Sequence, residues 1–159
     1  MITRSCRLAV SGQPATHRTV AYLSHDDKDL FVVFVCFEKR GKIRTGAYAG
    51  NRHSEKDTVE ILVDINEDRP RTYAFASSPL GTKDSQVFID HQSAGPVDSP
   101  WEADSRITGD GFVVKMTVPF ATLNSKIFDP SFLGVWGLRL RRHVAHSHEY
   151  DAWPAGDRR

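Results

Sequence analysis

The stretch Trp101–Trp153 constrains the fold of this chain more than any other part of it. Two segments, 102–108 and 111–118, flank the tripeptide Gly109-Asp110-Gly111. A glycine-rich tripeptide between two short segments is typical of the tight turn of a β-hairpin. Reactive side chains do not gather here in a catalytic pattern. The stretch therefore predicts an antiparallel β scaffold.

Other segments carry the same kind of signal. Leu30–Phe37 is almost continuously apolar, so we expect a strand with both faces covered. The segment Asp57–Asp64 alternates: Val59, Ile61 and Val63 point to one face of a strand, and the other face carries Thr58, Glu60, Leu62 and Asp64. Pro119 has no N–H for a strand ladder, so the preceding strand should end there and a short helical turn should follow at 119–124. We expect a further strand at 134–144. The fold class is therefore all-β: a single antiparallel β-sandwich of the immunoglobulin-like or jelly-roll type.

Length and charge exclude several classes of function. The 159 residues suffice for one domain, and we expect an irregular arm or edge strand at 1–18, the sandwich at 19–153 and a tail at 154–159. A net charge of +1 gives no reason to expect a nucleic-acid partner. No apolar run approaches the roughly 20 residues of a membrane span, so we expect no membrane insertion by this chain. Leu8–Val10 is too short for the apolar part of a secretory signal peptide.

A series of short motifs follows a particular order between residues 19 and 153. The motifs are Leu30-Phe31-Val32-Val33-Phe34, Asp57–Asp64, Tyr73, Phe75, Pro79-Leu80-Gly81, Trp101-Glu102-Ala103, Gly111–Phe120, Trp136-Gly137, Arg142, Glu149 and Trp153. The series resembles the carbohydrate-binding module family nine-like domains, which belong to the wider DOMON-like group of β-sandwiches. The acidic-glycine turn and tryptophan that open this family are not visible before residue 19. The chain thus resembles a member that is divergent or truncated at its amino end.

The resemblance implies a function. Sugar-binding members of the family typically lie beside glycosidase domains or at the front of larger exported proteins. This implies non-catalytic binding of an oligo- or polysaccharide of the xylan or cellulose type, an extracellular or periplasmic location, and a neighbouring domain or subunit that degrades the polysaccharide. The second aromatic of the family's sugar clamp is missing from 51–56. The alternative is therefore a structural or assembly domain of a larger exported protein that has lost sugar binding.

Five residues are candidates for the carbohydrate site: Trp153, Glu60, Arg139, Arg141 and Glu149. By position in the family series, Trp153 resembles the aromatic platform for the sugar ring, and Glu60 resembles the acceptor of sugar hydroxyls. Trp153 is either that platform or an aromatic that packs across a sheet edge. Glu60, oriented by Arg139 or Arg141 of a neighbouring strand, is either a hydroxyl acceptor or one half of a structural ion pair.

A glycosidase needs two carboxyl groups about 5 to 9.5 Å apart. Glu60, Asp64, Glu102 and Glu149 are the plausible suppliers, and their spacing selects neither an acid nor a base. We therefore expect no catalytic residue in this chain. Glycoside hydrolase activity is the second alternative to sugar binding.

Three histidines near the carboxyl end raise the question of a metal. His146 and His148 would share one face of a strand and, with Glu149 and His143 nearby, offer zinc or copper ligands. Their spacing matches no established metal motif, so a solvated histidine cluster is favoured and no metal ligand is assigned. Some members of the family carry structural calcium, but no calcium ligand set can be assembled from this sequence. We expect no cofactor.

Overall fold

The structure is a computed structural model that describes residues 2–7, 9–10, 13–46, 56–66, 70–123 and 136–154. These residues form mainly β-strands, together with two short 3-10 helices, η1 (Arg40–Lys42) and η3 (Phe120–Leu123). Helix η3 follows directly on the strand that Pro119 ends, which confirms the predicted helical turn at 119–124. Within the described ranges, no helix has the length and apolar character needed to cross a membrane.

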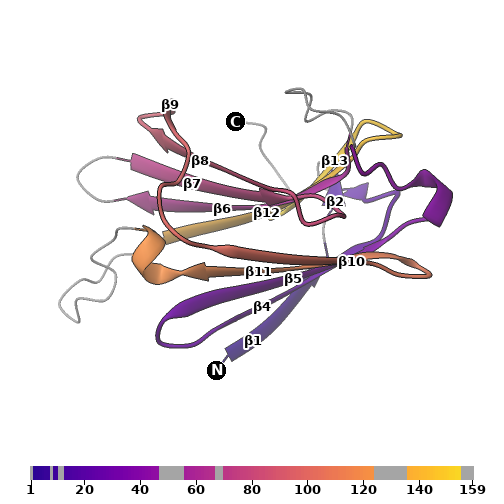
Figure 1. Ribbon diagram of the computed structural model, residues 1–159, viewed down its shortest axis with the longest axis horizontal. Helices are drawn as coiled ribbons and strands as arrows, with labels where there is room; N and C mark the ends of the chain where they lie inside the picture. The colour runs from indigo at the N-terminus through magenta and orange to yellow at the C-terminus, as the bar shows by residue number, and fades with distance from the viewer. Residues whose placement is uncertain are drawn as a thin grey trace.

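The strands assemble into two sheets that stack as two layers (Figure 1). The five-stranded sheet has the order β1 (Ile2–Arg7), β4 (Thr19–His25), β5 (Asp29–Phe37), β11 (Gly111–Pro119) and β10 (Glu102–Ile107). The eight-stranded sheet has the order β3 (Gln13–Pro14), β2 (Ala9–Val10), β13 (Glu149–Trp153), β12 (Trp136–Val144), β6 (Thr58–Asn66), β7 (Pro70–Ser77), β8 (Lys83–Ile89) and β9 (Gln92–Gly95). Neighbouring strands run antiparallel in both sheets. The predicted all-β antiparallel sandwich is confirmed.

The core lies between the two sheets and is built by alternate residues of the central strands. In β6, Val59, Ile61 and Val63 are completely buried, on the face that the alternating sequence predicts. In β5, every second residue from Leu30 is buried, while the residues between them are half-buried. The prediction that both faces of 30–37 are covered is therefore wrong. The apolar residues of the outer face of β5 pair across the strands with β4 and β11, and this pairing shields them only in part.

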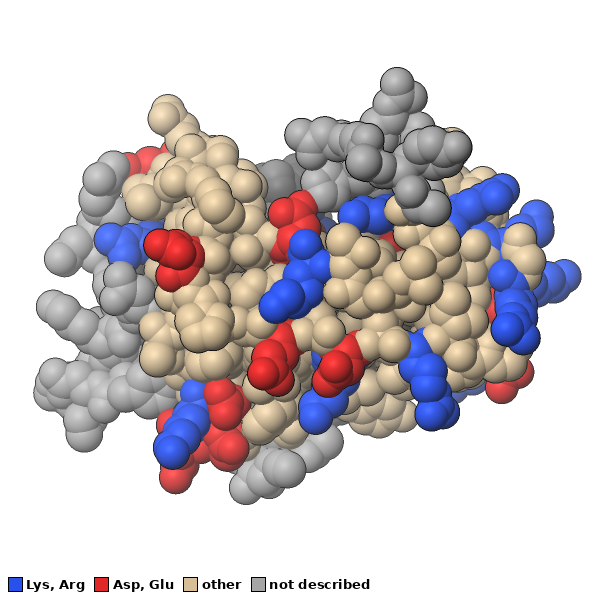
Figure 2. Space-filling model, viewed as in Figure 1, with Lys and Arg blue, Asp and Glu red and all other residues tan. Residues whose placement is uncertain are grey.

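The predicted hairpin is present, because β10 pairs with β11 across the turn that contains Gly109. The amino-terminal residues contribute to both layers: β1 lies at the edge of the five-stranded sheet, and β2 and β3 lie at the edge of the eight-stranded sheet beside β13. On the face turned to the viewer in Figure 1, acidic and basic side chains are intermixed (Figure 2). This mixture agrees with the net charge of +1.

Candidate functional site

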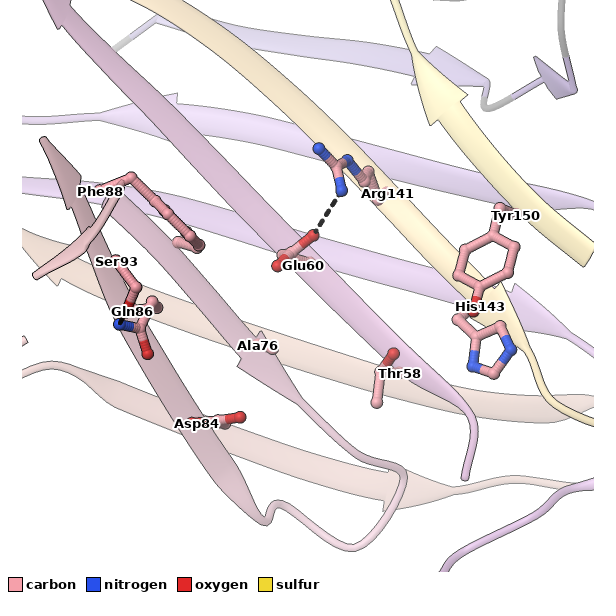
Figure 3. A pocket seen from close by; sticks show the side chains of 11 residues that line it. Thr58, Glu60, Ala76, Asp84, Gln86, Phe88, Ser93, Arg141, His143 and Tyr150 are labelled. Carbon is pink, nitrogen blue, oxygen red and sulfur yellow. Dashed lines mark hydrogen bonds and ion pairs between the residues drawn. The ribbon is translucent and has the colours of Figure 1, made fainter. Parts of the chain in front are cut away.

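A pocket of about 430 Å³ lies on the outer face of the eight-stranded sheet, across strands β6 to β9, β12 and β13. Its lining residues are Thr58, Glu60, Ala74, Ala76, Asp84, Gln86, Phe88, Ser93, Arg141, His143 and Tyr150 (Figure 3). The volume falls within the range of about 300 to 1,000 Å³ that is usual for small-molecule sites. In β6 these residues alternate with the buried core residues, so the pocket opens away from the five-stranded sheet.

One row of directly paired residues forms the middle of the pocket. Arg141 pairs with Glu60, Glu60 pairs with Ala76, and Ala76 pairs with Asp84. Directly paired residues of antiparallel strands project to the same face, so these four lie next to one another across four strands. The small side chains of Ala76 and of Ala74, which lies in the next row opposite Leu62, leave space between the longer polar side chains on either side. The hollow therefore follows from alanines in a strand flanked by polar residues.

The carboxylate of Glu60 and the guanidinium of Arg141 form an ion pair in this row. The Arg141 NH1 and Glu60 Oε2 atoms are 3.5 Å apart, and the two side chains are 35% and 27% exposed, respectively. Partly exposed pairs of this kind contribute roughly 0 to 1 kcal/mol to stability. Both groups can therefore exchange this contact for hydrogen bonds to a bound molecule at little cost in stability.

An aromatic platform stands at one end of the pocket. Tyr150 of β13 is 62% exposed, and its ring stacks on the ring of His143 with 4.4 Å between centroids and 23° between planes. The Nδ1 atom of His143 lies 3.2 Å from the carbonyl oxygen of Lys56, and this contact orients the imidazole beneath the tyrosine. Figure 3 shows Tyr150 and His143 together at the end of the pocket away from Phe88. A stacked and exposed phenol offers a broad apolar surface with a polar tip.

The structure brings two of the five candidate sugar-binding residues into this pocket, namely Glu60 and Arg141. Arg139 projects to the same outer face of β12, where it pairs with Leu62 one row away, and it does not line the pocket. We expected an arginine of a neighbouring strand, either Arg139 or Arg141, beside Glu60. In the structure that arginine is Arg141. Arg139 has no part in it.

Trp153 lies on the other side of the sheet. It pairs with Leu140, a completely buried core residue. Directly paired residues project to the same face, so the Trp153 side chain belongs to the face that is turned toward the five-stranded sheet. The indole is 37% exposed at the end of β13, but it does not line the pocket. The hypothesis that Trp153 faces Glu60 across a cleft thus disagrees with the register, which sets Ala152 rather than Trp153 opposite Arg141.

Glu149 also has a different position from the one expected. Its Oε1 atom accepts hydrogen bonds from the backbone N–H groups of Thr16 and His17, at 3.0 and 3.4 Å. Glu149 pairs with buried Val144, and so it too belongs to the inner face of the sheet. The carboxylate holds the segment that leads into β4 and does not reach the pocket.

The four carboxylates considered for hydrolysis do not face one another. Glu60 lines the pocket, Asp64 accepts a hydrogen bond of 2.6 Å from the Thr72 hydroxyl, and Glu102 lies on β10 of the other sheet. Glu149 is on the inner face, as described above. The second carboxylate of the pocket is Asp84, which the sequence reasoning did not select.

The three histidines are dispersed as well. His143 lines the pocket, while residues 145–148 form a turn, so His146 and His148 do not share a strand face. His148 is exposed and has a φ of 53°. The predicted grouping of these histidines with Glu149 is therefore wrong, because the chain reverses direction at this point. In the turn between β4 and β5, Oδ1 of Asp26 accepts the N–H groups of Lys28 and Asp29, both at 2.8 Å, and so stabilises its own turn.

Sequence reasoning missed Tyr150, His143 and Asp84 as pocket residues. A signal for Asp84 was present, since Asp84, Gln86 and Phe88 alternate along β8 and share one face. Tyr150 had no such signal, because its position beside His143 depends on the register between β12 and β13.

A buried carboxyl group near Glu149 gives a testable pH dependence. Burial raises the pKa of Asp151 from its ordinary value of 3.8 to about 7, and the charge of Glu149 adds to this rise. Between about pH 4 and pH 7 the folded chain then holds a proton that the unfolded chain has lost, so the free energy of unfolding falls as the pH rises. We expect a fall of roughly 2 to 4 kcal/mol across this range.

Urea unfolding at pH 5 and pH 7 measures this dependence. Asp151→Asn removes the titrating group and should flatten the profile, whereas Asp104→Asn, at an exposed position of β10, should leave the profile as in the parent chain. The carboxyls of Glu38 and Glu149 have lowered pKa values, so their opposite contributions are lost only at lower pH. A parent profile that is flat from pH 5 to pH 7 would contradict the prediction.

The fold and the site together define an antiparallel β-sandwich with an open pocket on the outer face of one sheet. A scan of family models and a search of curated protein sequences find no match to the chain. Solved structures do match. A Bacteroides uniformis protein, provisionally assigned as carbohydrate-binding, has a TM-score of 0.69 and 15% identity over 94% of this chain and 76% of its own.

Two further matches are family 9 carbohydrate-binding modules from Caldicellulosiruptor kristjanssonii. The module solved in complex with cellotriose has a TM-score of 0.60 and 17% identity, over 94% of this chain and 70% of its own. The module solved in complex with glucose has a TM-score of 0.58 and 16% identity, over 91% and 72%. The fold predicted from the ordered motifs, that of the family nine-like sandwiches, is confirmed by these similarities.

Proposed function

We propose that the chain is a non-catalytic carbohydrate-binding module and that the pocket on the outer face of the eight-stranded sheet is its sugar site. The observation that carries the proposal is the exposed Tyr150 at one end of a pocket that also contains the carboxylate of Glu60 and the guanidinium of Arg141. Modules with this fold have been solved with cellotriose and with glucose, which supports the same class of ligand here.

The chemistry of the pocket suits a sugar ring. The Tyr150 ring provides an apolar surface for the C–H face of a pyranose, and its stacking on His143 limits the freedom that binding would otherwise remove. Glu60 and Asp84 can accept hydrogen bonds from sugar hydroxyls, while Arg141 can donate to their oxygens. Acceptors and donors on both sides of a small-residue floor are what a polyol with several hydroxyls requires.

The ligand that we propose is a chain of the cellulose or xylan type. The pocket extends across six neighbouring strands, with Tyr150 at one end and Phe88 at the other, so it offers an aromatic ring for more than one sugar unit. Phe88 lines the pocket, and we propose that it serves as the second aromatic in the absence of one before Asp57. We also propose that a neighbouring domain or subunit outside the cytoplasm supplies the catalytic step of polysaccharide breakdown.

Calorimetric titration with cellotriose, xylotriose and glucose tests the proposal. Glu60→Gln removes the charge from one hydrogen-bond acceptor and should weaken binding about 10- to 100-fold, because a hydrogen bond to a charged group contributes about 1.5 to 3 kcal/mol. Tyr150→Ala should weaken binding by at least about tenfold. Matched controls on the other sheet are Glu102→Gln and Tyr22→Ala, which alter an exposed carboxylate and an exposed tyrosine outside the pocket.

Other outcomes identify the rival functions. Absence of heat with every sugar would favour a structural or assembly domain that has lost its ligand. Release of reducing sugar that Glu60→Gln or Asp84→Asn abolishes would identify a glycoside hydrolase. Binding that Trp153→Ala removes and Tyr150→Ala leaves intact would move the site to the inner side of β13 and overturn the proposed pocket.

A further inference from the structure

Three side chains from distant parts of the sequence meet beside the turn between β12 and β13, and none of them lines the sugar pocket. His17 lies in the segment before β4, Glu38 directly follows β5, and His146 lies in the turn between β12 and β13. The Oε2 atom of Glu38 is 2.8 Å from Nδ1 of His17 and 3.0 Å from Nε2 of His146. The two imidazole rings meet edge to face, with 4.9 Å between their centroids.

The cluster is shielded but still open to solvent. The Glu38 side chain is 4% exposed, while the side chains of His17 and His146 are 17% and 14% exposed. The exposed parts of the two histidines form the rim of the cluster, so an ion can reach the Glu38 carboxylate from solvent.

Neighbouring groups hold two of these side chains in place. The backbone N–H of His17 donates to the carboxylate of Glu149, and the Oγ atom of Ser147 lies 3.5 Å from Nε2 of His17. The Oε1 atom of Glu38 accepts the N–H of Lys39 at 2.9 Å, which leaves Oε2 for the two imidazoles. Outer contacts of this kind orient the ligands of a metal site.

We propose that His17, Glu38 and His146 form a binding site for a divalent first-row transition metal ion of the zinc class. Two imidazole nitrogens and one carboxylate oxygen are a ligand set that zinc accepts, and three protein ligands leave one position for water. The three ligand atoms lie within 4.8 Å of one another. Ligands of one tetrahedral zinc ion stand roughly 3.3 Å apart, so the two contacts to Glu38 need to open by a few tenths of an ångström. The widest pair of ligand atoms, up to 4.8 Å apart, needs to close toward the same separation.

Arg142 sets a limit on the affinity of this site. Its NH2 atom lies 3.8 Å from Oε2 of Glu38, so its positive charge repels a cation bound there. We therefore expect a moderate affinity rather than that of a closed structural zinc site. The metal site is separate from the proposed sugar pocket, since none of its three residues lines that pocket.

Titration of untagged, chelator-treated protein with Zn²⁺ tests the site, and the visible absorption of bound Co²⁺ reports its ligands. We expect one ion per chain. His17→Ala and His146→Ala should each weaken Zn²⁺ binding by at least roughly tenfold. Removing a residue that merely contacts a metal ligand already costs about 10- to 100-fold in affinity, so removing a ligand itself should cost no less. Zn²⁺ should raise the melting temperature of the parent chain and not that of these variants, because an ion that binds only the folded state stabilises it.

Two matched variants complete the design. His148→Asn changes an exposed histidine of the same turn and should leave Zn²⁺ binding intact. Asparagine is chosen because it tolerates the positive φ of position 148. Glu60→Gln should also leave it intact, even though that change weakens sugar binding, so the two sites fail independently. Circular dichroism in chelator confirms that each histidine variant is folded. Absence of Zn²⁺ binding, or binding that persists in both alanine variants, would overturn the metal site and leave an ion-pair cluster in its place.

Discussion

Replacing Gly111 with alanine is expected to destabilise the chain by more than about 4 kcal/mol, the size of change that follows from a severe clash. Gly111 begins β11 with a φ of 148°, a conformation that residues with a Cβ atom rarely adopt. A Cβ atom here would lie 1.9 Å from the carbonyl oxygen of Cys36 and 2.9 Å from the backbone nitrogen of Glu38. These are backbone atoms of the neighbouring strand β5 and of the residue that follows it, so no side-chain rotation relieves the overlap.

The same hairpin provides the control. A Cβ atom at Gly109 meets nothing within 4 Å, so Gly109→Ala should change the free energy of unfolding by less than about 1 kcal/mol. Urea unfolding of both variants and of the parent chain measures the difference. Similar midpoints for the two variants would show that β11 and β5 do not approach each other this closely.

Replacing Arg142 with methionine is expected to cost about 3 to 5 kcal/mol, the range observed when one member of a buried charged group is removed. Arg142 is completely buried, and its NH1 group donates to the hydroxyl of Thr19 at 2.9 Å and to the backbone carbonyl of Phe37 at 3.4 Å. Its guanidinium also lies 5.5 Å from the ring centroid of Phe112 and 3.8 Å from the carboxylate of Glu38. Methionine fills part of the volume but removes the donor of the Thr19 hydroxyl and of the Phe37 carbonyl, together with the charge that faces Glu38.

Arg141→Met is the matched control, because Arg141 precedes Arg142 on β12 and points to the opposite face. Arg141 is 35% exposed in its pair with Glu60, so its loss should change stability by less than about 1 kcal/mol. Asp151 pairs with Arg142 across the strands, so adding Asp151→Asn to Arg142→Met should recover part of the lost stability. Unfolding midpoints that are equal for Arg141→Met and Arg142→Met would contradict the buried role of Arg142.

Short-range patterns were sufficient for much of the fold. In β6 the alternation of Val59, Ile61 and Val63 with polar residues predicted which face is buried, because side chains of a strand alternate strictly between its two sides. The hairpin between β10 and β11 followed from turn chemistry, which depends on a few adjacent residues. The same alternation set Arg139 and Arg141 on one face of their strand as alternative partners of Glu60, and the register between β6 and β12 selects Arg141.

The positions of Trp153 and Glu149 needed the register of β13 against β12. A shift of one residue in register exchanges the two faces of a strand, and local sequence does not specify the register here. With Trp153 opposite Leu140, the aromatic of β13 that lines the pocket is Tyr150. Sequence reasoning identified an aromatic near the end of the chain as the sugar platform, and the structure offers its neighbour three residues earlier.

The sequence by itself determined that this protein is made of strands, where most of them lie, and which residues of each strand are apolar. Only the tertiary structure decided which strands are neighbours and therefore which side chains meet. The pocket draws on strands β6 to β9, β12 and β13, and Glu38 and His146 meet although they are 108 residues apart. The physical reason is range: alternation and turn preferences act between adjacent residues, whereas strand pairing is set by the packing of the whole sandwich.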